Sequence, residues 1–435
     1  MKKVFALLVA ITMIAALMLG CSSNKDNQTS ETTQSGDDKS QTSKTTDDSG
    51  SKEDNGDAES KAASGNVTIW YYWEAIKHQE SLNALIQKFN DSQSDITVEA
   101  KYVPFADFKK QLSIGASADE LPDLVILDNP DHAAYAAMGI FADITDKFDV
   151  STYFDGPVNS CTVDGKLYGV PFGSNDLLLF YNEDMLKAAN QEVPTTWDEL
   201  LVVAKATTTD TVSGFAHCSL QNEEGTFNFL PWVWSTGATS YEINSEGGIK
   251  ALTFVQKLIE SGSMTKEAIN WTQGDTMNQF ISGNLAMMIN GTWQIPTMRS
   301  EVPDLNWNVA LIPKDAQPTS GLGGENYAVI AGGNEDATIE FLKFATSKEQ
   351  CLFMMNNMGY ISSDSTIAEG QFAGDPIYEV FVEGMKYAYA RGPLPEWPDV
   401  SDAISLAFNE VITGASSPED AAAKAQITID GIIGQ

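Results

Sequence analysis

The hydrophobic pattern becomes regular only after residue 65, where strand-like and helix-like spacings alternate. The run "NVTIWYYWE" at 66–74 is rich in β-branched and aromatic residues, which predicts a buried strand. Four apolar side chains then recur at the spacing of one helix face: Leu82, Leu85, Ile86 and Phe89. A strand at 95–103, a helix at 105–118 and a strand at 121–130 follow. This order predicts βαβ units and a mainly parallel sheet.

A later stretch has the same alternating style with a different sequence. "GKLYGVPFGSNDLLLFYNEDML" contains two apolar strand-like runs and then a helix that begins near Glu183. "VPTTWDELLVVAKA" predicts another helix, with Thr195 or Thr196 as N-cap and Glu199 as the capping-box partner. Further helices are predicted at 247–261, 273–283, 336–346, 348–358, 376–390 and 400–413. The fold class is therefore α/β.

The ends of the first strands are the first candidate positions for a ligand. Ligands of open parallel sheets bind at the carboxyl ends of the strands. Trp73 and Glu74 end the first predicted strand, and Asp128 ends the third. These three side chains are therefore expected at a crevice.

Residues 1–20 have the pattern of a secretion signal. Lys2 and Lys3 precede a nearly uncharged apolar run at 5–20, which is shorter than the ~20 residues of a membrane-spanning helix. "LMLGC" resembles the bacterial lipobox, which implies that Cys21 receives lipid and becomes the new N-terminus. A plain cleaved signal peptide is the alternative.

The segment 21–65 is predicted to be a disordered tether. It is dominated by Ser, Thr, Asp and Lys and offers almost nothing that could form a core. A flexible chain of this length spans about 35–40 Å. The protein is therefore expected to work at the extracellular face of the bacterial cytoplasmic membrane, anchored there by lipid.

Charge and cysteine usage narrow the class of partner. The chain has 60 Asp and Glu against 26 Lys and Arg, a net charge of −34, which repels nucleic acid and anionic lipid headgroups. Three further cysteines stand far apart without a CxxC pair, so buried thiols are expected: Cys161, Cys218 and Cys351. The three histidines lack metal-ligand spacing, and neither a metal nor another cofactor is expected.

Six segments in register point to a known family. They are "LPDLVILD", "MGIFADITD", "DGKLYGVPFGSNDLLLFYNEDML", "PTTWDELLVVAKA", "FISGNLAMMINGTWQIP" and "RGPLPEWPDVSDAISLAFNEVITGASSPEDAAAKAQ". In this order and spacing they resemble extracellular solute-binding proteins of the maltose-binding type, which deliver sugars to ABC importers. The resemblance covers essentially all of residues 66–435.

The resemblance implies two α/β lobes with mainly parallel sheets, three interlobe crossings and a ligand cleft that closes by a hinge. The crossings are expected near 173–177, 287–293 and 322–327. The expected division is 66–174 with 291–322 for lobe I, and 175–290 with 323–435 for lobe II. The implied partners are a small carbohydrate and the membrane permease subunits of the importer, and the implied state is a monomer.

A sugar presents C–H faces and hydroxyl edges, so its binder needs aromatic plates and planar polar groups. The aromatic candidates for the cleft are Trp73, Trp232, Trp293 and Trp397, whereas Trp197, Trp271 and Trp307 are interpreted as structural. Trp397 stands between two prolines and is expected outside regular helix. The polar candidates, chosen because carboxylates accept two hydroxyls and guanidinium donates in a fixed fork, are Glu74, Asp128, Asn175, Asp176, Glu325 and Arg391.

The chain departs from the maltose-specific members at one position, and three other functions are considered beside sugar capture. Ile404 stands where the maltose-specific members have an aromatic residue, which argues against maltose itself. A secreted glycoside hydrolase would also use paired carboxylates and aromatic plates. The sequence lacks GxSxG, GxxxxGK and HExxH motifs, and we expect no enzyme. A binder of a polyamine or other non-sugar solute, and a structural adhesin without a closable cleft, are the remaining alternatives.

Overall fold

The computed structural model describes residues 63–434. The predicted signal peptide, Cys21 and all but the last residues of the predicted tether lie outside the described residues. Between residues 63 and 434, no helix combines the length and the apolar composition that crossing a bilayer requires.

Within these residues, ten strands form one mixed sheet in the order β2-β1-β3-β10-β6-β8-β7, with β12 beside β10 and with β9 and β11 beside β6. The strands are β1 Gly65–Tyr71, β2 Ile96–Tyr102, β3 Leu124–Asp128, β6 Val170–Asn182, β7 Ala216–His217, β8 Met287–Gly291, β9 Trp307–Ala310, β10 Ser320–Val329, β11 Ile361–Ser362 and β12 Ala388–Ala390. A separate small hairpin consists of β4 Thr162–Val163 and β5 Lys166–Leu167.

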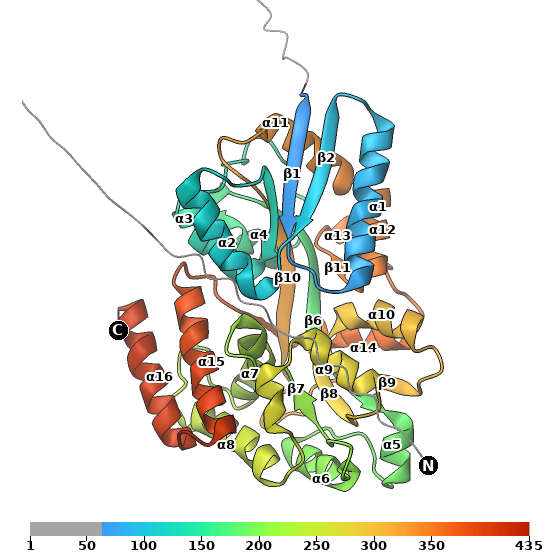
Figure 1. Cartoon of the computed structure of the whole chain (residues 1–435), viewed down its shortest axis with the longest axis vertical. Helices are drawn as coiled ribbons and strands as arrows, with labels where there is room; N and C mark the ends of the chain where they lie inside the picture. The colour runs from blue at the N-terminus through green and yellow to red at the C-terminus, as the bar shows by residue number, and fades with distance from the viewer. Residues whose placement is uncertain (1–62, 435) are drawn as a thin grey trace, which may run out of the picture. The chain divides into compact units, whose positions relative to one another are not determined.

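Two long strands run through both halves of this sheet. β1 pairs in parallel with β2 and β3, as the βαβ pattern predicts. β10 is antiparallel to β3 and to β6, and the other end of β6 is antiparallel to β8 and β9. β6 (green) and β10 (orange) therefore lie side by side at the centre and connect the two groups of elements (Figure 1).

The buried side chains divide into two lobes, one at each end of these strands. Two core clusters draw on residues 67–172 and 327–367, which we call the first lobe, and two draw on 177–312 and 378–429, the second lobe. The first-lobe helices are α1 Ile76–Ser92, α2 Phe105–Ala118, η1 Asn129–Asp131, α3 His132–Ala137, α4 Asp155–Ser160, α11 Glu335–Ala345, α12 Lys348–Met358 and α13 Ser365–Ala368. Those of the second lobe are α5 Glu183–Ala188, α6 Trp197–Thr207, α7 Glu223–Ser235, α8 Glu246–Glu260, η2 Lys266–Asn270, α9 Gln273–Ile281, η3 Thr292–Gln294, α10 Ile295–Glu301, α14 Pro376–Met385, α15 Trp397–Thr413 and α16 Pro418–Ile433.

Local sequence signals explain where the helices begin. The four apolar residues predicted to share one face of α1 are all buried. At α6 the capping is divided between two threonines: Thr196 Oγ1 accepts from the backbone N–H of Glu199, and Glu199 Oε2 accepts from the backbone N–H of Thr195.

The three predicted thiols, Cys161, Cys218 and Cys351, are buried and unbridged among the described residues.

The packing differs from the predicted lobe boundaries. Ile295 and Ile312, expected in the first lobe, pack in second-lobe clusters, whereas Tyr327 and Phe341, expected in the second, pack in a first-lobe cluster. The cause is the direction of β10. This strand runs into the first lobe, where it pairs with β3, and the next helix, α11, packs against β1 and β10 there. The chain also stays in the second lobe after β8, so the crossing predicted at 287–293 lies instead after α13.

The second lobe has an aromatic core centred on Trp232, which is fully buried. Its ring centroid lies 5.1 Å from that of Phe254 and 6.0 Å from that of Trp197. The prediction that Trp232 lines the cleft is therefore wrong. Nearly every residue of α7 is buried. The Trp232 side chain lies in the core of the second lobe and not at the cavity.

We predict that Trp232→Ala lowers the free energy of unfolding by about 3–5 kcal/mol, because it opens a cavity in a packed aromatic cluster. Val202→Ala, at a side chain that is 61% exposed, serves as the control and should stay within about 0.5 kcal/mol of the parent. Urea denaturation measures both. Equal stability of the two variants would contradict this placement.

Candidate functional site

A cavity of about 300 Å³ lies between the two lobes, and side chains of both lobes line it. This volume is at the lower end of the range for small-molecule sites. Its first-lobe wall includes Tyr72, Trp73, Glu74, Phe105, Asp128, Glu325 and Tyr360. Its second-lobe wall includes Glu223, Glu224, Phe227, Gln273, Gly274, Trp293 and Arg391.

Aromatic side chains form part of both walls. Phe227 on α7 and Trp293 on η3 are nearly parallel, with ring centroids 6.2 Å apart and an angle of 18° between the planes. On the opposite lobe, the Tyr72 ring meets Phe105 edge-on at 4.8 Å. Flat, rigid apolar surfaces of this kind bind the C–H faces of a ligand.

Glu325 on β10 is a buried acceptor with one oxygen fully engaged. Its Oε1 accepts from Tyr72 Oη, Trp73 Nε1 and Tyr360 Oη, each at 3.0 Å. Its Oε2 has no hydrogen-bond partner within residues 63–434, although the side chain is only 5% exposed. Burial, and then the negative charge of Asp128, raise the pKa of Glu325 to about 7. The Glu325 carboxyl is thus held in place with one acceptor to offer.

Two glycines of β10 let its backbone pass close to β6, where a second acceptor, Asn175, lies. A Cβ on Gly323 would lie 2.2 Å from Asn175 Oδ1, and one on Gly324 would lie 2.2 Å from the carbonyl oxygen of Gly173. Gly324 also has a φ of +145°, which favours glycine. Asn175 Oδ1 is buried and lacks a hydrogen-bond partner in the part of the chain that the structure describes.

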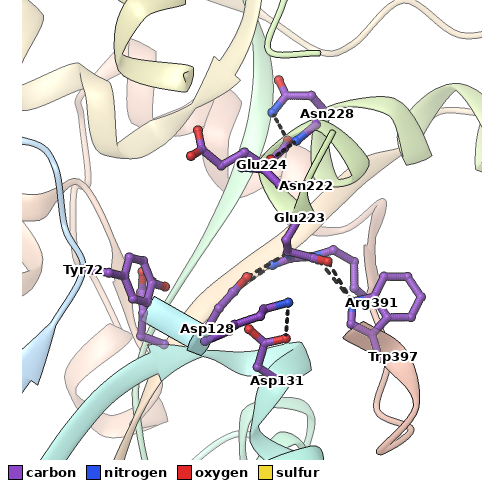
Figure 2. Close-up of polar contacts among 12 residues, drawn as sticks. Tyr72, Asp128, Asp131, Asn222, Glu223, Glu224, Asn228, Arg391 and Trp397 are labelled. Atoms are coloured by element: carbon purple, nitrogen blue, oxygen red, sulfur yellow. Dashed lines mark hydrogen bonds and ion pairs between the residues drawn. The ribbon is translucent and has the colours of Figure 1, made fainter. Parts of the chain in front are cut away.

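A buried guanidinium joins the two lobes at one side of the cavity (Figure 2). Arg391 donates from both terminal nitrogens to the two oxygens of Asp128, each at 2.9 Å, and from Nη1 to Glu223 Oε1 at 2.6 Å. Trp397 Nε1 donates to the same Glu223 carboxylate. The Arg391 guanidinium also lies 4.0 Å from the ring centroid of Phe227. Although burial opposes its charge, Asp128 and Glu223 raise the pKa of Arg391.

Each member of this network comes from a different part of the chain. Asp128 ends β3 in the first lobe, Glu223 begins α7 in the second, and Arg391 follows β12. Asp128 and Glu223 already use both terminal nitrogens of Arg391. These two nitrogens hold the cavity walls together. The buried Nε of Arg391 has no hydrogen-bond partner among residues 63–434, so donation by Arg391 to a ligand stays a prediction.

Carboxylates from both lobes meet near the N-terminus of α9. The Glu74 carboxylate lies against Gly274, since a Cβ there would be 2.9 Å from Glu74 Oε2. Glu224 Oε2 accepts from the backbone N–H of Gln273 at 2.9 Å. Burial and then Asp275 raise the pKa of Glu74, and burial raises that of Glu224 to about 7 with a further contribution from Glu74.

The cavity brings together seven of the ten predicted site residues: Trp73, Glu74, Asp128, Asn175, Trp293, Glu325 and Arg391. Asp176 is not among its lining residues, because its carboxyl is fully buried against Gly384. Trp397 is also fully buried and begins α15, contrary to the prediction, because a proline is compatible with the first turn of a helix.

Sequence reasoning missed the other lining residues, among them Tyr72, Glu223, Glu224, Phe227 and Tyr360. A signal was present for the α7 residues. Asn222 caps that helix by accepting from the backbone N–H of Gly225, and an acidic pair follows it. An acidic first turn is ordinary in helices, so this signal alone does not distinguish a site from a cap.

Comparison with known proteins connects this geometry to a family. Residues 84–379 match the family described as bacterial extracellular solute-binding protein. The lactose-binding protein of Rhizobium radiobacter is 25% identical over 396 residues, covering 84% of this chain and 92% of that protein. The galactooligosaccharide-binding protein of Bacillus subtilis is 24% identical, covering 83% of this chain and 88% of that protein.

Solved structures give the same result for the fold. An ABC-transporter solute-binding protein from Thermotoga lettingae, bound with α-D-tagatose, superimposes with a TM-score of 0.79 at 25% identity, covering 85% of this chain and 100% of that one. The GacH receptor of Streptomyces glaucescens, whose structures include a complex with acarbose, has a TM-score of 0.77 at 25% identity, with 86% and 99% covered.

We predict a pH-dependent stability that traces to Glu325. Its pKa is 4.5 when exposed and about 7 in the folded protein, so the folded state holds a proton that the unfolded chain has released between these values. The contribution of Glu325 to stability is therefore complete below pH 4.5 and is lost as the pH rises to 7. The parent therefore loses stability over this pH range, whereas Glu325→Gln, which has no proton to release here, does not. The free energy of unfolding of Glu325→Gln relative to that of the parent should rise by roughly 3 kcal/mol.

Urea denaturation at several pH values measures this difference. Glu349→Gln, at an exposed position of α12, is the matched control and should show a constant difference from the parent. A constant difference for Glu325→Gln as well would contradict the buried, proton-holding carboxyl.

Proposed function

The chain belongs to the bacterial extracellular solute-binding proteins, and from this premise we propose that it captures a mono- or oligosaccharide between its lobes and delivers it to an ABC-type importer. Relatives of similar length are named as binding proteins for lactose and galactooligosaccharides. The names of these relatives favour a sugar over the polyamine considered from the sequence.

One observation supports the sugar most directly. The same interlobe cavity has a parallel aromatic pair, Phe227 and Trp293, and two buried acceptor atoms, Glu325 Oε2 and Asn175 Oδ1, without partners among the described residues. The aromatic faces suit the C–H patches of a sugar ring, and the acceptors suit its hydroxyl edge. A purely apolar ligand would leave both acceptors unsatisfied, which costs about 1–3 kcal/mol each.

These contacts are sufficient for receptor-like affinity. A micromolar dissociation constant corresponds to about −8 kcal/mol. Aromatic contacts contribute about 0.5–1.5 kcal/mol each beyond their buried area. Hydrogen bonds to charged groups contribute about 1.5–3 kcal/mol each. Two or three contacts of each kind, together with the buried area, reach this range.

We propose capture without chemical turnover. Both oxygens of Asp128 accept from Arg391, and one oxygen of Glu325 accepts three hydrogen bonds. A hydrolase of the usual type needs one carboxyl as a mobile acid and another as a base or nucleophile at the scissile bond. The fixed pairing of Asp128 suits a wall of a binding site better than this role.

The receptor is proposed to be a monomer that contacts the membrane through lipid on Cys21, after removal of the signal peptide at residues 1–20. The acid-rich segment 21–65 then serves as the tether to the solute-binding part. The support for this anchor is the sequence: a basic start, an apolar run and the lipobox-like "LMLGC".

We predict that Cys21→Ser moves the protein out of the membrane fraction. In cells fractionated with a phase-separating detergent, the parent should enter the detergent phase, and the variant the aqueous phase. Cys161→Ser, at a buried thiol, is the control and should partition as the parent does. An aqueous parent would contradict the anchor without affecting the proposed binding site.

Sugar capture is tested by thermal shift of the full chain against a panel of mono- and oligosaccharides, with amino acids and polyamines included. A ligand of the folded state raises the melting temperature by mass action. We predict a rise for one sugar family with no product on chromatography. A shift by a non-sugar solute alone, or consumption of a sugar, would overturn the proposal.

For the sugar that gives this rise, Trp293→Ala should weaken binding about ten- to a hundredfold, because one face of the stacked pair is lost. Trp70→Ala is the matched control, since Trp70 is half-buried on β1 and does not line the cavity. Isothermal titration calorimetry measures both variants. Unchanged affinity in Trp293→Ala with normal folding would place the site elsewhere.

A further inference from the structure

Acidic side chains are the most numerous charged groups of the cavity wall. The lining carboxylates are Glu74, Asp128, Glu223, Glu224, Glu301 and Glu325. In the described chain the basic lining residues are Arg391 and His78, and burial lowers the pKa of His78 to about 4, so it is neutral at physiological pH. A single fixed cation therefore faces six carboxyl groups.

The charge of Arg391 does not extend to the rest of the cavity. Its guanidinium is paired with both Asp128 and Glu223, and the trio retains a net negative charge. The nearby Lys109 ammonium pairs with Asp131 at 2.9 Å. Glu325, Glu224 and Glu74 thus have no cationic partner among residues 63–434, although each accepts from or lies against neutral groups.

Glu325 provides an independent sign that a ligand donor belongs here. Glu325 is only 5% exposed, and three neutral donors converge on its Oε1 alone. Oε2 is left without a donor in the described part of the chain. A buried acceptor is normally satisfied, so an acceptor at a binding cavity without a protein partner marks where a ligand donates.

The second group of carboxylates lies across the lobe boundary. Glu74 belongs to the first lobe and Glu224 to the second. Burial raises the pKa of both carboxyls, Asp275 raises both further, and Glu74 adds to the rise at Glu224. Like charges that are brought together and dehydrated oppose closure. A positive group on the ligand removes this opposition, whereas a neutral ligand does not.

Resting on the proposed function, we infer that the captured sugar carries a protonated amine, and that Glu325 Oε2 accepts a hydrogen bond from this ammonium while Glu74 and Glu224 supply the surrounding negative charge. An amino sugar therefore binds more tightly than the same sugar with a hydroxyl at that position. Sugars with a carboxylate or phosphate are rejected, since a second anion would enter an already negative cavity.

The test compares sugars that differ at one substituent. The full chain is titrated calorimetrically with glucose, glucosamine, N-acetylglucosamine and glucuronate, then with the same four members of the galactose series and with the β-1,4 dimers of glucose and glucosamine. The amine should bind about tenfold or more tightly than its hydroxyl partner, since a charge-assisted hydrogen bond replaces a neutral one. 1,4-Diaminobutane, an amine without a sugar ring, should bind weakly because it cannot use the aromatic faces.

The outcomes separate this inference from the proposed function. Equal or tighter binding of the neutral hydroxyl member overturns the inference and leaves the sugar receptor intact. Tight binding of diaminobutane without any sugar binding overturns both. These comparisons use only the parent protein and do not depend on the folding of a variant.

Two isosteric variants test which carboxylate causes the preference for the amine over the hydroxyl. Glu325→Gln should reduce the amine-to-hydroxyl affinity ratio to about one, because an amide no longer offers a charged acceptor. Glu349→Gln removes the same charge from an exposed position of α12 that does not line the cavity, and it should change the ratio less than about twofold, since exposed charges interact weakly. A ratio that stays high in Glu325→Gln would refute the assignment to this carboxyl.

Discussion

The interlobe site depends on a buried guanidinium that two lobes share. Arg391 is held by Asp128 from the first lobe and Glu223 from the second, at distances of 2.6–2.9 Å. Removing one partner from such a buried network leaves an uncompensated charge, which makes the arrangement geometrically strict. Because Glu223 begins α7 and Arg391 lies over Phe227, the network also fixes the aromatic wall. The position of the Phe227 ring is thus set by the ion pairs that lie beside it.

A second constraint comes from the long strands that cross between the lobes. Glu325 and Asn175 lie on β10 and β6, so the backbone that connects the lobes also presents the buried acceptors. Glycines at 323 and 324 permit the close approach that this requires. A change in the angle between the lobes would therefore move the side chains of each lobe, whereas Glu325 and Asn175 would stay in place on the connecting strands. This suits a receptor that must hold one solute and later release it.

The sequence predicted the fold class, the helices with clear faces and caps, and seven residues now found around one cavity. These features follow from local periodicity and from the resemblance of six segments. Trp232, Trp397 and Asp176 were misplaced because their burial depends on contacts far along the chain, such as Trp232 with Phe254 or Trp397 with Glu223. Phe227 and Tyr360 were missed for the same reason, since an aromatic residue in a helix or before a strand has no local mark of lining a cavity.

A sugar is proposed to bind between the lobes, against the Phe227–Trp293 pair and Glu325. Hydrogen exchange of backbone amides, with and without a sugar that raises the melting temperature, tests it most directly. Added protection is expected in the segments that line the cavity from both lobes, at residues 72–78, 223–228, 273–278 and 323–325. Protection confined to one lobe, or located at a surface away from these segments, would contradict it.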